Sequence, residues 1–197
     1  MSRSRGARFN VAEGAPFFYC SSLLTTKFMT TILSERFRHW FEYEKDAHAK
    51  SLASLRTVPE GQRPSPSYQK AISLFAHILT ARKMWLYRFG VSSEPVHDLF
   101  PQHLALDHLP GFAEEVHRMW DAYLARLNDE ELARVFDYQS LDAGKFRNTV
   151  EEILTQLFGH SWYHRGQIAQ LVKSLGGEPA VTDFVYWSRE PVIDEQA

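Results

Sequence analysis

The chain of 197 residues has little cysteine, no excess of basic residues and no long apolar run. Its one cysteine, Cys20, excludes an internal disulfide framework and a cysteine-based metal site, as is usual in a reducing, cytoplasmic compartment. Its 22 Lys and Arg residues are outnumbered by 24 Asp and Glu, so no basic excess exists to capture nucleic acid. No run approaches the roughly 20 apolar residues of a membrane-spanning helix. Its 44% hydrophobic residues are instead typical of one soluble, folded domain.

Apolar residues recur at helical spacing in four stretches of the chain. The predicted helices cover about residues 31–56, 68–89, 112–127 and 149–175. Each can bury its apolar stripe only against the others, which predicts an all-α four-helix bundle. Ser67 is the expected N-cap of the second helix.

Two connections stand out between these helices. Residues 91–111 carry three prolines and form a connection long enough to cover a site. The pattern from Val135 to Asn148 favours a short hairpin before the last helix. Thr149 and Glu152 then have the spacing of a capping box that opens that helix.

The bundle is expected to span residues 29–190. Residues 1–28 are rich in arginine and contain helix-breaking residues, which suits a tail, an upstream extension or a targeting segment. Residues 191–197 are expected to form a C-terminal tail.

Nine histidines are the conspicuous excess of this sequence. His160 and His164 lie one turn apart on the apolar face of the last predicted helix, and His77 lies on the apolar face of the second. A buried imidazole without a partner costs roughly 1–3 kcal/mol, and a shared metal ion would remove that cost. In a chain of this length with nine histidines, the number of HxxxH pairs expected by chance is roughly 0.4. Histidines whose hydrogen bonds are satisfied within the core therefore remain the alternative.

The wider sequence around the last two histidines is more specific. The string Phe158-Gly-His160-Ser-Trp-Tyr-His164-Arg165-Gly166-Gln167-Ile168 resembles the last helix of the DinB-like (DNA damage-inducible) family of four-helix bundles, proposed to be metalloenzymes. The resemblance covers roughly residues 31–187 and is strongest at this helix. It implies one metal-binding histidine on the second helix and two on the fourth, which correspond here to His77, His160 and His164.

Other residues are candidates for supporting roles. Arg165 and Gln167 flank His164, and the family resemblance suggests that they orient the site or close the bundle. The alternatives are a surface salt bridge for Arg165 and a hydrogen bond at the edge of the core for Gln167. His48, one turn from Glu44, is either a fourth ligand, a residue supporting the ligands or an imidazole satisfied by another partner.

The remaining predictions concern exposure and packing. His39 and His117 are expected to be solvated, the histidines at 97, 103 and 108 belong to a polar loop or a second metal site, and Gly166 predicts a close helix approach.

Three imidazoles leave at least one coordination position open, which is typical of a catalytic metal. Zinc and nickel both suit imidazole ligands. The resemblance implies a metal-dependent enzyme that acts on a small electrophile, by hydrolysis or by transfer of a low-molecular-weight thiol. No acidic residue adjoins the HxxxH pair as in HExxH, so no general base can be named, which slightly favours thiol transfer. A noncatalytic stress-response bundle with a structural metal is the alternative, and a homodimer is plausible in either case.

Overall fold

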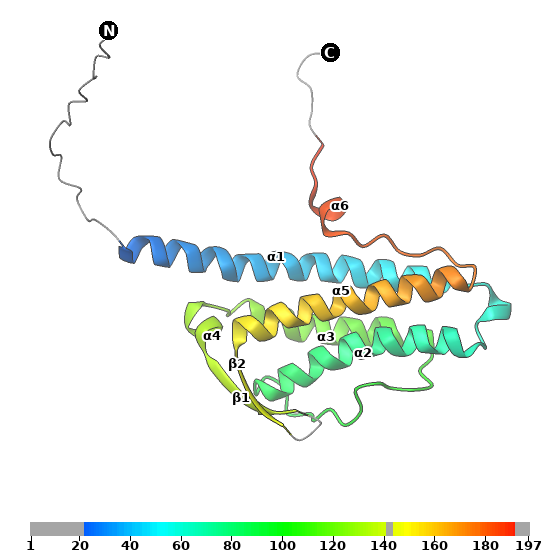
Figure 1. Cartoon of the computed structure of the whole chain (residues 1–197), viewed down its shortest axis with the longest axis horizontal. Coiled ribbons are helices and arrows are strands. Elements are labelled where there is room, and N and C mark those ends of the chain that lie inside the picture. Colours follow the sequence, from blue (N-terminus) through cyan, green and yellow to red (C-terminus); the bar gives the residue numbers. More distant parts are fainter. Residues whose placement is uncertain (1–21, 141–143, 192–197) are drawn as a thin grey trace, which may run out of the picture.

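Four long helices pack side by side, with a small hairpin at one end of the bundle (Figure 1). The computed structural model describes residues 22–140 and 144–191. The long helices are α1 (Ser22–Arg56), α2 (Pro66–Arg88), α3 (Leu109–Leu124) and α5 (Val150–Ser174). The predicted all-α four-helix bundle is therefore confirmed. Most of the expected N-terminal tail, residues 1–21, and most of the expected C-terminal tail, residues 192–197, lie outside the described residues.

Shorter elements join and flank the long helices. They are η1 (Glu60–Gln62), η2 (Leu106–His108), α4 (Asp129–Ala133), β1 (Val135–Gln139), β2 (Lys145–Thr149) and α6 (Phe184–Ser188). The two strands pair antiparallel, with Val135 opposite Thr149 and Gln139 opposite Lys145. The hairpin expected before the last helix is thus present, although its turn at 141–143 is outside the described residues.

The helix ends follow local capping chemistry. The predicted capping box is present: the Thr149 hydroxyl accepts from the Glu152 N–H, and the Glu152 carboxylate accepts from the Thr149 N–H. Ser65, rather than the expected Ser67, caps α2, because its hydroxyl accepts from the Tyr68 N–H. Pro66 then occupies the first turn, where its missing N–H costs nothing.

Two boundaries differ from the sequence prediction. Helix α1 begins at Ser22, nine residues before the expected start at Thr31. Helix α3 begins at Leu109, with Pro110 in its first turn, and ends at Leu124. Proline is tolerated in the first turn of a helix, so Pro110 opens α3 instead of belonging to the preceding loop.

The core lies where the four long helices meet. Helix α2 packs most extensively on α5 and also on α3, whereas α1 packs on α3 and α5. The largest fully buried side chains include Phe37, Phe41, Phe75, Trp120 and Leu154. One charged residue, Arg82, belongs to the same fully buried set. The bundle therefore encloses a polar centre as well as an apolar core.

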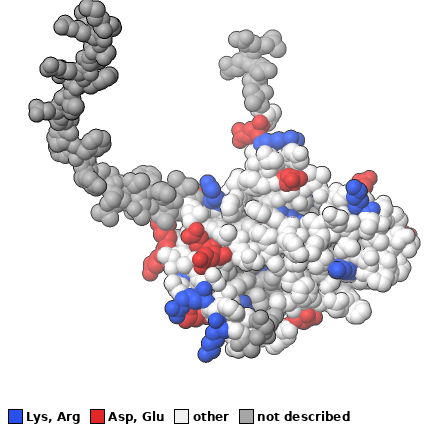
Figure 2. All heavy atoms as spheres, viewed as in Figure 1, with Lys and Arg blue, Asp and Glu red and all other residues white. Residues whose placement is uncertain are grey.

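The face seen in Figure 2 carries acidic and basic side chains in small groups of both signs. Helix α6 lies against α1, with the Trp187 ring 5.8 Å from the Tyr43 ring and 4.9 Å from the His39 ring. Within the described part of the chain, no helix is both long and apolar enough to span a bilayer.

Candidate metal centre

The three histidines selected from the sequence converge at one point between α2 and α5. The Nε2 atom of His160 lies 2.9 Å from the Nε2 atom of His77 and 3.1 Å from that of His164. One ligand atom from each residue falls within 4.8 Å of the others. His77 is 5% exposed and His164 is 9% exposed, while His160 is half-buried. Side chains from two helices, 83 residues apart in sequence, thus form one compact cluster.

Hydrogen bonds at the opposite ring nitrogens fix two of these imidazoles. The Nδ1 atom of His77 donates to the Leu99 carbonyl over 2.6 Å, since a carbonyl can only accept. The Nδ1 atom of His164 lies 2.7 Å from Oε1 of Gln167, so it also donates. A neutral imidazole carries one proton, and both Nε2 atoms therefore present lone pairs toward the centre.

Burial disfavours the charged form of two of the three imidazoles. Burial, together with the neighbouring His164 and His77, lowers the pKa of His160 to about 4. Burial also lowers the pKa of His77, although its hydrogen bond to Leu99 acts in the opposite direction. Neutral imidazole is the form that binds metal, so His77 and His160 are ready to act as ligands near pH 7.

The donor set fits a divalent transition metal ion. Tetrahedral ligands at about 2.0–2.1 Å from an ion lie roughly 3.3–3.4 Å from one another, close to the two nitrogen separations observed. Only His160 can carry a proton at Nε2, and it can donate properly to only one neighbour. A cation at the centre would satisfy all three lone pairs at once. Among the described residues, no carboxylate joins this group, so at least one coordination position would be left for another ligand.

The long connection between α2 and α3 covers one side of the cluster. The Phe100 ring stacks on the His77 ring, with 3.9 Å between centroids and 6° between planes. Gln102 ties the same loop to α2 through a hydrogen bond of 3.1 Å to the Ser73 hydroxyl. Phe100 remains 48% exposed, so it separates His77 from solvent. The expectation that this connection could cover a site agrees with its position.

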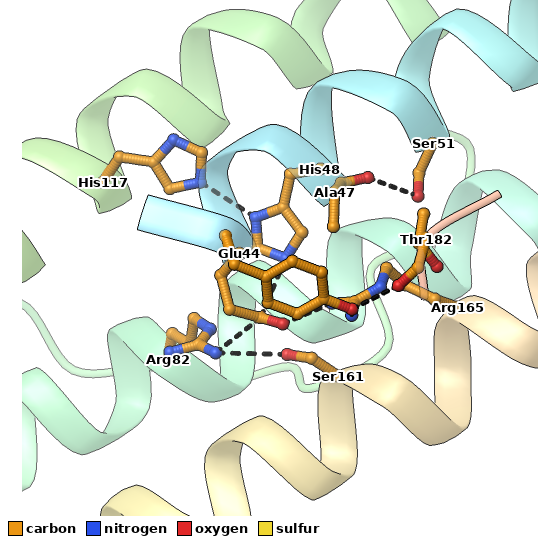
Figure 3. A network of polar contacts seen from close by, with 10 residues as sticks. Glu44, Ala47, His48, Ser51, Arg82, His117, Ser161, Arg165 and Thr182 are labelled. Carbon is orange, nitrogen blue, oxygen red and sulfur yellow. Dashed lines mark hydrogen bonds and ion pairs between the residues drawn. The ribbon is translucent and has the colours of Figure 1, made fainter. Parts of the chain in front are cut away.

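Arg165 does not face the histidine cluster. It points toward α1, where it pairs with the buried carboxylate of Glu44 and donates to the Tyr43 hydroxyl over 2.6 Å (Figure 3). Arg82 donates to the other oxygen of Glu44 over 2.7 Å and to Ser161 over 3.3 Å. The surface salt bridge offered as one alternative for Arg165 is wrong, because Arg165 is only 3% exposed. Gln167, in contrast, contacts His164 directly.

His48 belongs to this second network and does not join the three histidines. Its Nε2 atom lies 3.5 Å from Oε2 of Glu44, and its Nδ1 atom lies 2.9 Å from Nε2 of His117 (Figure 3). His48 is fully buried, and burial holds its pKa well below the usual range. This position matches the alternative in which His48 has another partner, His117, which pairs with its Nδ1 atom, whereas its Nε2 atom makes no hydrogen bond. His117 is half-buried rather than solvated as expected, because α1 supplies that partner across the interface with α3.

The remaining histidines do not form a second centre. His39 is exposed, although its ring contacts α6. His97, His103 and His108 are exposed in or beside the connection. In the described ranges, the group at His77 is the sole set of three or more potential ligands within reach of one ion.

These features define a class of protein, a four-helix bundle with a three-histidine site on its second and last long helices. Comparison with known sequences gives the family: the sequence model of the DinB family matches residues 29–193, and the chain therefore belongs to that family. It is 31% identical to Protein DinB of Bacillus subtilis (strain 168) over an alignment of 81 residues, and the match covers 36% of this chain and 46% of that relative. The match thus spans about half the length of the relative. No solved structure matches the chain significantly.

Proposed function

We propose that this protein is a metal-dependent enzyme in which His77, His160 and His164 hold one divalent ion, zinc or nickel. The observation that carries the proposal is the convergence of three Nε2 atoms, two of which must present lone pairs because their Nδ1 atoms donate elsewhere. When bound, such an ion supplies Lewis acidity that activates water or a thiol as a nucleophile. Membership of the DinB family is compatible with this role.

The substrate would be a small electrophile, and the thiol would be of low molecular weight. Among the described residues, no Asp or Glu donates to or accepts from any of the three histidines. A general base for hydrolysis is therefore not supplied at the ligands themselves, which favours thiol transfer. The chain's own residues fix the tautomers of His77 and His164 through Leu99 and Gln167, and Phe100 shields His77. Burial disfavours the charged forms of His77 and His160.

Metal analysis of protein purified without chelator tests this proposal. We expect about one equivalent of a divalent transition metal per chain, and loss of that metal in His160→Ala. His97→Ala is the matched control, because it removes an exposed histidine from the connection without touching the cluster. Absence of stoichiometric metal in the unmodified protein, or full retention in His160→Ala, would show that the proposal is wrong.

Activity is tested separately on the metal-loaded protein. We expect consumption of a low-molecular-weight thiol by a chromogenic aryl halide to depend on the bound metal and to be lost in His160→Ala. Tight metal binding without thiol transfer or hydrolysis would instead support the noncatalytic bundle with a structural metal.

A further inference from the structure

A groove of about 530 Å³ lies between α1 and α3, whereas the three candidate metal ligands belong to α2 and α5. Its apolar lining comes from Ala49 and Leu52 of α1 and from Pro110 and Ala113 of α3. His48 and His117 line it as well. Apolar walls with a few polar groups, at this volume, are typical of small-molecule sites. The groove thus contains two imidazoles that the candidate metal centre does not use.

The charged side chains of the groove balance one another. Lys45 and Arg118 carry positive charge, and Glu114 and Asp121 carry negative charge. Lys45 on α1 also pairs with Asp121 on α3, with 3.0 Å between nitrogen and oxygen. A lining with both signs in equal number gives no net attraction to an ion. A neutral molecule therefore suits the groove better than an anion or a cation.

The buried carboxylate of Glu44 sets the tautomer of His48. The Nε2 atom of His48 lies 3.5 Å from Oε2 of Glu44 and makes no hydrogen bond (Figure 3). A lone pair on Nε2 would face a negatively charged oxygen, whereas an N–H group at this position is attracted to it. A neutral imidazole carries one proton, so His48 is protonated at Nε2 and presents a lone pair at Nδ1.

The tautomer of His48 in turn sets that of His117. Nε2 of His117 lies 2.9 Å from Nδ1 of His48 and must donate to it, which leaves the lone pair of His117 at Nδ1. Within the described part of the chain, this Nδ1 atom makes no hydrogen bond, and it is not enclosed as Nε2 of His48 is, so solvent reaches it. Burial lowers the pKa of His117 to about 4, which keeps the lone pair unprotonated near pH 7. Because His117 lines the groove, this acceptor is available to a molecule bound there.

We propose that the groove between α1 and α3 binds a small neutral molecule with an apolar body and one hydrogen-bond donor, such as a phenol, and that this donor bonds to Nδ1 of His117. The apolar walls accommodate the body, and the balanced charges give an ionised ligand no advantage. The contacts from Glu44 through His48 make Nδ1 of His117 an acceptor. The candidate metal ligands lie on other helices, so this site is independent of the proposed metal centre.

Binding of phenol and anisole to the full chain at pH 7 tests the proposal. The two probes share an aromatic ring, but anisole has a methyl group in place of the hydroxyl proton and cannot donate. Titrations followed by nuclear magnetic resonance measure both affinities. We expect phenol to bind about two- to tenfold more tightly, as for one net hydrogen bond. Equal affinities, or no binding of phenol, would contradict the proposal.

Nitrogen chemical shifts of the imidazoles test the acceptor directly. In protein with ¹⁵N-labelled histidine, Nδ1 of His117 should have the shift of an unprotonated ring nitrogen and Nε2 that of a protonated one. Phenol should move the Nδ1 signal to lower frequency, and anisole should leave it in place. A protonated Nδ1 atom in His117, or a signal that phenol does not move, would overturn the assignment.

Three variants locate the binding. Ala49→Leu places a larger side chain on the exposed wall of the groove and should weaken binding of both probes. Ala53→Leu makes the same change at an exposed position of α1 outside the lining and should bind like the unmodified protein. His117→Leu, checked for folding by circular dichroism, should lose the preference for phenol over anisole. Unaltered binding in Ala49→Leu, or an unchanged preference in folded His117→Leu, would show that the probes bind elsewhere.

Two further variants examine the other places that could take phenol. His160→Ala removes a candidate metal ligand, and Gly166→Leu obstructs a second groove of about 480 Å³, between α2 and α5. A Cβ atom built at Gly166 meets no heavy atom within 4 Å, so a larger side chain has room there. The close helix approach expected at Gly166 from the sequence is therefore wrong. Both variants should bind phenol like the unmodified protein, and loss of binding in either would overturn the assignment to α1 and α3.

Discussion

Glu44 on α1 accepts a hydrogen bond of 2.7 Å from Arg82 on α2, and both side chains are completely buried. The second oxygen of Glu44 pairs with Arg165 on α5. One carboxylate thus joins three helices, of which two carry the histidines of the candidate metal centre. Burial lowers the pKa of Arg82, but its pairing with Glu44 acts against this effect. The two arginines and one carboxylate form a triad whose charges depend on one another.

Glu44→Gln is expected to destabilise the fold strongly. Removing the carboxylate leaves two buried guanidinium groups without a counter-charge, and breaking a buried ion pair in this way costs about 3–5 kcal/mol. The free energy of unfolding, measured by denaturant titration at pH 7, checks this value. Glu42→Gln is the control, because Glu42 is exposed and pairs with Lys45 at the surface, where a salt bridge contributes about 0–1 kcal/mol. Equal losses in the two variants would contradict the importance of the triad.

The sequence predicted the histidine cluster because its signal is local. His160 and His164 are four residues apart, and the helical period alone places them on the same apolar face as Leu157 and Leu171. The distance between the two long helices could not be obtained in this way. It depends on side-chain packing between α2 and α5, which brings His77 to His160 across 83 residues of sequence.

The buried triad was missed although a signal for it exists. Charged residues are usually exposed, so a surface role for Arg165 stayed open beside orienting the site or closing the bundle. Glu44, however, continues the apolar face marked by Phe37 and Phe41, at a step of three residues. A charge on such a face indicates a buried ion pair, but its partners lie 38 and 121 residues away and follow only from the fold.

Phe100→Ala should speed metal loss more than it weakens metal binding. The ring of Phe100 covers His77 but donates nothing to a metal, so its removal opens a path for solvent and chelator. We expect faster transfer of cobalt or zinc to a chelating dye, with the equilibrium affinity changed less than the rate. Phe146→Ala is a matched control, since Phe146 is a similarly exposed aromatic residue on the hairpin. Identical rates in both variants would show that Phe100 is not a shield.

Gln167→Ala is expected to weaken metal binding while leaving the fold intact. Gln167 accepts from Nδ1 of His164 and so keeps the lone pair of Nε2 directed at the centre. Loss of such a supporting partner typically lowers metal affinity by about 10- to 100-fold. Competition with a chelator of known affinity measures the change. Gln156→Ala, which alters an exposed glutamine of the same helix, should bind metal like the unmodified protein. Unchanged affinity in Gln167→Ala would contradict this role.

Acid should destabilise the metal-free protein through His48 and His117. Burial lowers the pKa of His117 to about 4 and holds that of His48 well below its usual range, whereas both titrate near pH 6.5 when unfolded. Between these values the unfolded chain binds more protons than the folded one, so stability is full above about pH 6.5 and falls as the pH drops toward 4. Denaturant titrations from pH 7 to 4.5, in the presence of a chelator, measure this dependence.

His117→Gln removes one of these groups but keeps a donor toward His48, so its stability should fall less steeply with acid. Contributions from the other histidines cancel in the comparison between variants, and His97→Gln, an exposed position, should keep the full slope. Parallel curves for His117→Gln and the unmodified protein would show that the His48 and His117 pair does not titrate with unfolding.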